Sequence, residues 1–191
     1  TGAEKERMGA YRSADGGNLF ADEIGDLPEE IQPTFLRVLE EHKVTPVGSD
    51  GAVPVNVRIV AATNRPLHEL VEEGGFRQDL MSRLGQAEIE LPPLRERGED
   101  IPILLDHFLK EWNEEYGEDR TVASELLRLL MDYPWPGNVR ELRNVVRNMC
   151  ATQRTEELTP KHLPPALRRH FERLGGGSEG DGGAFSWELP P

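Results

Sequence analysis

Cysteine is almost absent from this chain of 191 residues, which contains only Cys150. A single cysteine excludes an intrachain disulfide and any metal site built from cysteine pairs. Basic residues are scarce as well, because 22 lysines and arginines stand against 35 aspartates and glutamates, for a formal net charge of −13. Since nucleic-acid binding needs a concentrated basic surface, we expect any contact with DNA to come from a domain that is not present in this chain.

The sequence also lacks long apolar runs. No stretch approaches the roughly 18 apolar residues of a membrane-spanning helix, and the polar, charged start from Thr1 to Arg12 is unlike a signal peptide. Hydrophobic residues nevertheless make up 37% of the chain and charged residues 30%, which is enough apolar material for a folded core. The composition predicts a soluble, cytoplasmic protein without membrane contact.

The first half of the sequence alternates between short apolar runs and stretches with helical periodicity. This alternation is typical of an α/β fold with a parallel sheet flanked by helices. The predicted strands are 18–21, 58–62 and 87–91, the predicted helices follow Pro28 and Pro66 and cover 76–84, and residues 43–57 are predicted to form a hairpin-like excursion with a turn near 49–51.

After the pair Pro92-Pro93 the pattern changes to helices alone. Apolar stripes at helical spacing cover 101–116, 122–133 and 139–149. Three such helices can bury their stripes only against one another, so they predict a small all-α domain. Thr121 and Asn138 are the predicted N-caps of the second and third helices.

A flexible linker is predicted near the end of the sequence, because six of the nine residues from Gly175 to Gly183 are glycine. The predicted organisation is therefore an α/β part over 1–92, a helical domain over 93–174 and a glycine-rich tail over 175–191.

Two adjacent carboxylates, Asp22 and Glu23, follow the first predicted strand. The carboxyl end of a parallel strand faces the crevice in which α/β proteins bind ligands. There, one carboxylate can hold Mg²⁺ through water while the next polarises an attacking water, which is the arrangement that nucleotide hydrolysis requires. The alternative is a solvated strand end that leads into a helix.

Thr63 and Asn64 end the second predicted strand in the same way. A hydroxyl or amide at this position could sense a phosphate or position a water. Because polar residues commonly follow strands, an ordinary loop is the alternative.

Three arginines are candidates for binding a phosphate. Arg77 and Arg83 lie six residues apart in one predicted helix, and a guanidinium is permanently charged and can reach the γ-phosphate of a neighbouring subunit. Arg140 begins the third helix of the small domain and could reach a phosphate held between the two domains. The alternatives are surface arginines, with Arg77 or Arg83 paired to Asp79, and a solvated basic helix face.

Five segments occur in an order and at a spacing that chance does not explain: 16–27, 61–65, 76–84, 91–101 and 133–142. Together they resemble the AAA+ central domain of bacterial enhancer-binding proteins, the activators of sigma-54 RNA polymerase. The resemblance covers about residues 1 to 167, and its most specific strings are LPPLRER at 91–97 and WPGNVREL at 135–142.

The resemblance implies a role for each candidate residue. Thr1, Gly2 and Ala3 match the last residues of the loop that contacts the sigma factor, and residues 43–57 match the second loop near the pore surface. The nucleotide site is implied to consist of the Walker B acids Asp22 and Glu23, the sensor I residues Thr63 and Asn64, the trans-acting arginines Arg77 and Arg83, and the sensor II arginine Arg140, with Asp22 holding Mg²⁺ through water.

The function that the resemblance implies is ATP hydrolysis in a ring, expected to be a hexamer, with Mg²⁺ as the metal. The ring would use this energy to remodel the sigma-54 RNA polymerase holoenzyme at promoters. The implied fold is a partial AAA+ P-loop NTPase core followed by a helical lid domain.

The sequence departs from this family in one important respect. A P-loop needs Gly-Lys followed by Ser or Thr, and none of the four lysines in the chain follows a glycine. We expect the first strands and the P-loop to precede Thr1 in the coding sequence, and this chain alone to be inactive as an ATPase. The alternative is a non-catalytic AAA+-like scaffold or interaction module that has lost its P-loop, and the upstream coding sequence would distinguish the two.

Overall fold

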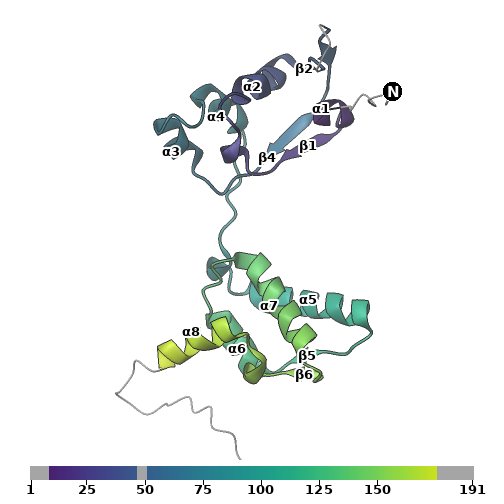
Figure 1. Ribbon diagram of the computed structural model, residues 1–191, viewed down its shortest axis with the longest axis vertical. Helices are drawn as coiled ribbons and strands as arrows, with labels where there is room; N and C mark the ends of the chain where they lie inside the picture. The colour runs from purple at the N-terminus through teal and green to yellow at the C-terminus, as the bar shows by residue number, and fades with distance from the viewer. Residues whose placement is uncertain (1–8, 47–50, 176–191) are drawn as a thin grey trace, which may run out of the picture. The chain divides into compact units, whose positions relative to one another are not determined.

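The computed structural model describes residues 9–46 and 51–175, and the chain divides into two compact units (Figure 1). The first unit ends at Ile89 and the second begins at Glu90. Each unit has its own cluster of buried apolar side chains. None of the helices in the described part of the chain combines the length and the apolar character needed to cross a bilayer.

The first unit has the predicted α/β fold. Its central feature is a parallel pair of strands, β1 (Asn18–Ala21) and β4 (Arg58–Ala61), in which Ala21 lies opposite Ala61. The antiparallel pair β2 (Lys43–Val44) and β3 (Val53–Pro54) forms the predicted hairpin-like excursion, whose predicted turn lies partly outside the described residues. The helices are α1 (Ala10–Ser13), α2 (Gln32–Glu41), α3 (Leu67–Glu72) and α4 (Gln78–Leu84), with a 3-10 turn, η1 (Ile24–Asp26).

One face of the β1–β4 pair packs against the helices (Figure 1). Ala21, Ile59 and Ala61 contact the core on this face, whereas Phe20 and Val60 are 63% and 44% exposed. The alternation follows from the two-residue period of a strand. The buried centre of the unit consists of Ile24, Phe35, Leu70, Phe76 and Leu80.

Two predictions for this unit are wrong in detail. Residues 87–91 do not form a strand, and Ile89 and Leu91 are 84% and 79% exposed. A strand needs a neighbour to pair its backbone groups, and none of the described strands pairs with this segment. The helix predicted after Pro28 begins only at Gln32, because the residues before it form a turn in which the Pro28 carbonyl accepts from Ile31.

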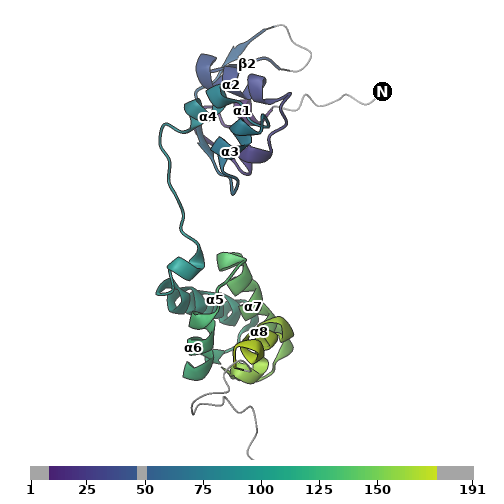
Figure 2. The same ribbon diagram turned by 90° about the vertical axis from the view of Figure 1, so that its left-hand side faces the viewer.

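The second unit is a helical domain whose first three helices lie in the predicted regions. Its long helices α5 (Asp100–Tyr116) and α7 (Asn138–Thr152) lie side by side in both views (Figures 1 and 2). A final helix, α8 (Pro165–Gly175), was not predicted. The other elements are α6 (Ser124–Asp132), the 3-10 turns η2 (Leu94–Glu96) and η3 (Pro160–His162), and a short parallel pair, β5 (Thr121–Val122) with β6 (Glu157–Leu158).

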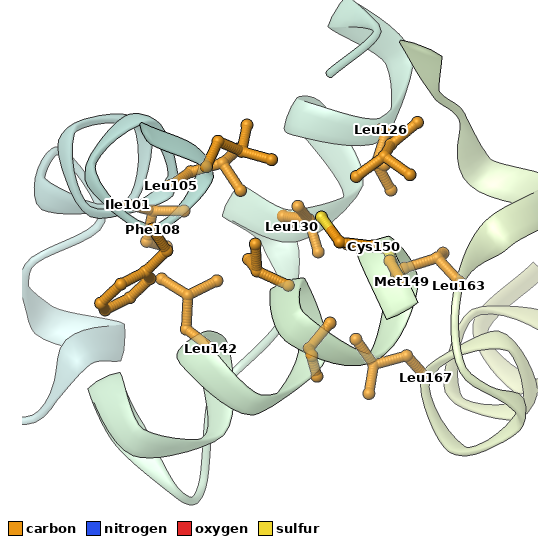
Figure 3. Close-up of a cluster of buried hydrophobic side chains, with 14 of the residues drawn as sticks. Ile101, Leu105, Phe108, Leu126, Leu130, Leu142, Met149, Cys150, Leu163 and Leu167 are labelled. Atoms are coloured by element: carbon orange, nitrogen blue, oxygen red, sulfur yellow. The ribbon is translucent and has the colours of Figure 1, made fainter. Parts of the chain in front are cut away.

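The apolar stripes of these helices meet in one core (Figure 3). Leu126, Leu130 and Leu142 are fully buried there, and Leu167 of α8 closes one side. Cys150 packs on α7 as predicted, and burial raises the pKa of its thiol. This cysteine is a core residue of the helical unit.

Both predicted N-caps are misplaced. Thr121 lies in β5, and α6 begins at Ser124. Asn138 is the first residue of α7, in a left-handed conformation with φ of 52°, and its Oδ1 accepts a hydrogen bond from the Leu94 N–H at 2.9 Å. The side chain therefore binds the segment before α5 instead of capping its own helix, and the Glu141 carboxylate accepts the Gly137 N–H at 2.8 Å.

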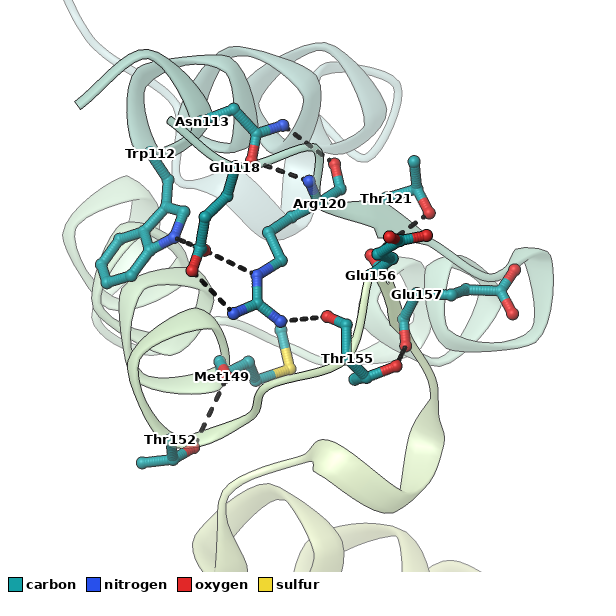
Figure 4. A network of polar contacts seen from close by, with 10 residues as sticks. All are labelled: Trp112, Asn113, Glu118, Arg120, Thr121, Met149, Thr152, Thr155, Glu156 and Glu157. Carbon is teal, nitrogen blue, oxygen red and sulfur yellow. Dashed lines mark hydrogen bonds and ion pairs between the residues drawn. The ribbon is translucent and has the colours of Figure 1, made fainter. Parts of the chain in front are cut away.

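A buried arginine joins the short β5–β6 pair to the helices (Figure 4). Arg120 donates to both carboxylate oxygens of Glu118, at 2.7 and 3.1 Å, and to the Thr155 carbonyl. The Trp112 indole N–H donates to the same carboxylate at 2.8 Å. The hydrogen bonds from Arg120 and Trp112 lower the pKa of Glu118, so their stabilisation is present above the ordinary carboxyl pKa and is lost as the pH falls through the depressed one.

We predict that Arg120→Met lowers the free energy of unfolding of the helical unit by about 1–3 kcal/mol, because it leaves the Glu118 and Thr155 oxygens without their donor. The matched control is Arg143→Met, which breaks the exposed pair with Glu111 and should cost less than about 1 kcal/mol. Urea unfolding followed by circular dichroism measures both, and equal losses would contradict the prediction.

Candidate nucleotide-binding edge

Two polar turns leave the same edge of the β1–β4 pair. Beyond the last register pair, the Ala62 N–H donates to the Ala21 carbonyl at 2.9 Å, and the Ile24 N–H donates to the Ala62 carbonyl at 2.9 Å. These bonds hold the turn at 22–23 beside the turn at 63–64. The carboxyl ends of the two parallel strands thus present Asp22, Glu23, Thr63 and Asn64 to solvent at one edge.

The first turn has an unusual backbone. Glu23 adopts a left-handed conformation with φ of 51°, which costs a non-glycine residue about 1–2 kcal/mol. Asp22 stabilises the turn, because its Oδ1 accepts the Glu23 N–H at 3.0 Å. Strained positions of this kind cluster at functional sites, and here the strain accompanies two exposed, adjacent carboxylates.

The two turns touch at Gly25 and Thr63. A Cβ atom on Gly25 would lie 2.7 Å from the Thr63 Oγ1, so a glycine is required there. The same Oγ1 accepts the Arg65 N–H at 3.1 Å, and the Arg65 guanidinium donates to Asp26 Oδ1 at 2.9 Å. The Thr63 hydroxyl is thus held in place between the turns, and its proton remains able to reach another acceptor.

The donor set at this edge fits a Mg²⁺ ion held mainly by water and by phosphate oxygens. The second carboxylate oxygen of Asp22 makes no hydrogen bond within residues 9–46 and 51–175. The described residues contain no group of three or more His, Cys, Asp or Glu side chains that could form a complete metal cage. Mg²⁺ in nucleotide-binding proteins is usually bound by one or two carboxylates together with substrate phosphates.

The candidate arginines of the first unit lie on α4 and immediately before it. Arg77 forms a two-pronged ion pair with Asp79, with nitrogen to oxygen distances of 2.9 and 2.6 Å. The pair raises the pKa of Arg77 and lowers that of Asp79. Arg83 donates a long hydrogen bond, 3.4 Å, to the Leu39 carbonyl at the end of α2. Both side chains are largely exposed, and an open surface depression is lined by Arg77, Gln78, Asp79 and Ser82.

The structure does not bring these arginines to the carboxylates of their own chain. Among the described residues, no hydrogen bond or ion pair joins Arg77 or Arg83 to the turns at 22–23 and 63–64. The α/β unit therefore carries two separate sets of charged groups, one acidic and one basic.

Arg140 lies in the helical unit, on the first turn of α7, and is exposed. The arginines that follow it on that helix are already paired with α5: Arg143 with Glu111 at 2.7 Å and Arg147 with Glu115 at 3.2 Å. In the described part of the chain Arg140 has no such partner. The predicted sigma-contact residues Thr1, Gly2 and Ala3 lie outside the described residues.

Sequence reasoning missed several residues that hold distant segments of the α/β unit together. Gly25 and the Asp26–Arg65 pair follow from a contact between segments far apart in the sequence, which carries no local signal. Gln32 is a buried polar residue on the apolar face of α2. Its spacing of three from the buried Phe35 was the one available sign that it faces the core.

Comparison with known proteins identifies both units. Residues 1–90 match the family model of the sigma-54 interaction domain, and residues 95–175 match that of the AAA+ ATPase lid domain. The regulator NtrC from Proteus hauseri is 46% identical over 174 residues, which are 91% of this chain and 37% of NtrC. The regulatory protein ZraR from Salmonella typhimurium is 44% identical over 171 residues, which are 87% of this chain and 38% of ZraR.

Solved structures agree with these matches. The crystal structure of NtrX from Brucella abortus in complex with ATP aligns with a TM-score of 0.81 at 36% identity, covering 86% of this chain and 38% of NtrX. The chain thus spans well under half of the length of NtrC, ZraR and NtrX. Fold and matches together define a partial AAA+ core followed by its lid domain. Within that class, the chain carries a sigma-54 interaction domain and is similar over most of its length to the transcriptional regulators NtrC and ZraR.

The contact between the two turns gives a direct test of this edge. Gly25→Ala should lower the stability of the α/β unit by about 1–3 kcal/mol, because the new methyl group would lie 2.7 Å from Thr63 Oγ1 and 3.3 Å from Leu70 Cδ1. Gly98→Ala is the matched control, since its Cβ would enter open space. Denaturant unfolding of both variants is the measurement, and equal stabilities would show that the turns do not meet as described.

Proposed function

We propose that this chain forms part of an ATPase ring that, with Mg²⁺, remodels the sigma-54 RNA polymerase holoenzyme at promoters. The observation that carries the proposal is the shared edge of β1 and β4, where an adjacent Asp22-Glu23 pair and the polar Thr63-Asn64 turn are exposed together. The match of residues 1–90 to the sigma-54 interaction domain, and the ATP complex of the similar NtrX, support a nucleotide as the ligand.

Each residue of the edge has a role that its chemistry permits. Asp22 would hold Mg²⁺ through water, and bound Mg²⁺ neutralises charge on the phosphates. Glu23, fixed in its left-handed turn, would accept a proton from the attacking water. Thr63 and Asn64 would contact the terminal phosphate or orient that water.

The nucleotide needs further contacts that these residues do not supply. No Gly-Lys-Ser/Thr segment occurs in the sequence, so the cradle for the β- and γ-phosphates would come from another segment of the intact protein. Arg140, exposed and without an ion-pair partner among the described residues, would act from the lid on the same phosphates.

The separation of the arginines from the carboxylates favours action between subunits. Arg77 and Arg83 are exposed and make no contact with the acidic edge of their own chain. A guanidinium supplied by a neighbour can stabilise charge on the transferred phosphate. This arrangement requires a ring in which each nucleotide lies between two subunits, which we propose is a hexamer.

The remaining partners follow from the same assignment. Thr1, Gly2 and Ala3 would end the loop that contacts the sigma factor. DNA would be bound by a domain outside this chain, consistent with its net charge of −13, and the protein would act in the cytoplasm.

The role of Glu23 is tested in the protein produced from its full coding sequence. Glu23→Gln should leave ATP binding near normal and lower turnover by about 10²-fold or more, the scale expected for loss of a general base. Calorimetry and steady-state ATPase assays measure the two effects, and Glu72→Gln, at the exposed end of α3, is the control. Full turnover of Glu23→Gln would refute this assignment.

Action between subunits is tested by mixing two inactive variants of the intact protein. Arg83→Ala should lower turnover by about 10³-fold, the scale of an arginine finger, but it leaves its own Glu23 intact. Mixed with Glu23→Gln subunits, which keep their own Arg83, it should regain activity at interfaces that combine the two intact residues. Failure to regain activity in rings shown to contain both variants would mean that Arg83 acts within its own subunit or is structural.

A further inference from the structure

Gln32 is an unusual residue of the α/β unit, because it is polar and completely buried. Among the described residues, only Gln32 and Arg120 are buried polar side chains, and Gln32 has no exposed surface. It is the first residue of α2, three positions before the buried Phe35. A buried polar group is tolerated only where its hydrogen bonds are made.

The amide of Gln32 joins three points on the backbone. Its Nε2 donates to the Leu27 carbonyl at 2.9 Å and to the Gly75 carbonyl at 3.0 Å, and its Oε1 accepts the Arg77 N–H at 2.9 Å. If the amide were turned by 180°, its NH₂ group would face the Arg77 N–H, which is also a donor. Its oxygen would then face the carbonyl oxygens of Leu27 and Gly75. The orientation is therefore fixed by chemistry.

Two of these bonds lie on the segment that presents Arg77. Gly75 and Arg77 flank Phe76, which is 3% exposed, and α4 begins one residue after Arg77. Gln32 thus fixes the backbone on both sides of the buried Phe76, immediately before α4. The Arg77 side chain remains outside, paired with Asp79 at the surface.

An apolar side chain of similar size could fill the same space, but it could not fix this backbone. Leu80 and Phe76 already anchor the segment by burial, which is non-directional. The amide adds a directional constraint. Its three hydrogen bonds can all form only when residues 75–77 and α2 have one position relative to each other.

We propose that Gln32 is a positioning residue for ATP hydrolysis, which holds Arg77 where it can reach the nucleotide bound to the neighbouring subunit. The inference rests on the proposed function, since it needs Arg77 to act between subunits. Gln32 itself, fully buried, touches neither nucleotide nor metal.

The test uses the intact protein and the variant Gln32→Met, which keeps an unbranched side chain but makes none of the three bonds. The dissociation constant for ATP should stay within about twofold of the wild-type value, while turnover falls at least tenfold. Gln86→Met, which replaces an exposed glutamine shortly after α4, is the matched control and should leave turnover unchanged.

Mixing experiments separate positioning from general damage. Gln32→Met subunits should regain activity with Glu23→Gln subunits, whose arginines are intact, but not with Arg77→Ala subunits, because both lesions then affect the same side of the interface. The reverse pattern, activity with Arg77→Ala and none with Glu23→Gln, would show that Gln32 supports its own nucleotide site and would overturn the inference.

Two further results are decisive. Full turnover of Arg77→Ala would remove the proposed role of Arg77 and this inference with it, whereas full turnover of Gln32→Met beside an inactive Arg77→Ala would overturn the inference alone.

Hydrogen exchange of the wild-type chain by NMR keeps the test valid even if Gln32→Met does not fold. The Arg77 amide should exchange at least tenfold more slowly than the Gln78 amide in the first turn of α4, where amides lack acceptors within the helix, and equal rates would overturn the inference.

Discussion

The parallel pairing of β1 with β4 is the constraint on which the α/β unit depends. These strands are separated in sequence by α2 and the β2–β3 hairpin, yet the pairing aligns Ala21 with Ala61 and carries two further backbone hydrogen bonds beyond them. A shift of one residue would turn the apolar face of a strand toward solvent. The same register places the turns at 22–23 and 63–64 side by side, and it demands a glycine at position 25.

Each unit adds one buried polar network to its apolar core, and the two networks have different consequences. Arg120 ties the short β5–β6 pair to the helices of the lid and serves its stability. Gln32 ties the start of α2 to the segment before α4. This segment carries Arg77 to the surface, so under the proposed function the network in the α/β unit bears on catalysis as well as on stability.

The sequence predicted strands and helices correctly where buried apolar residues repeat at a fixed spacing within one element. The runs at 18–21 and 58–62 predicted the two parallel strands, and the stripes beginning at Ile101 and Val139 predicted the long helices of the lid, since each pattern repeats within one element. The resemblance of five segments predicted the AAA+ class. The resemblance also implied that the carboxylates after β1 and the polar pair after β4 belong to one nucleotide site, and the structure exposes both pairs at one edge of the two strands.

Features that depend on distant partners were not predictable. Residues 87–91 have the composition of a strand, but no described strand pairs with them. Asn138 resembles a helix cap in sequence, but its side chain binds the Leu94 N–H instead. The hydrogen bonds of Gln32 span 43 and 45 residues to Gly75 and Arg77, so only the fold reveals why a glutamine stands on an apolar helix face.

In the proposed ring, one nucleotide lies between the acidic edge of one subunit and the arginines of the next. The most direct measurement is a structure of the intact protein, assembled with Mg²⁺ and a non-hydrolysable ATP analogue. We expect the terminal phosphate to lie beside Asp22, Glu23 and Thr63 of one subunit, with Arg77 and Arg83 of its neighbour directed at the same phosphate. A nucleotide bound away from the β1–β4 edge, or one that both arginines face away from, would contradict the account.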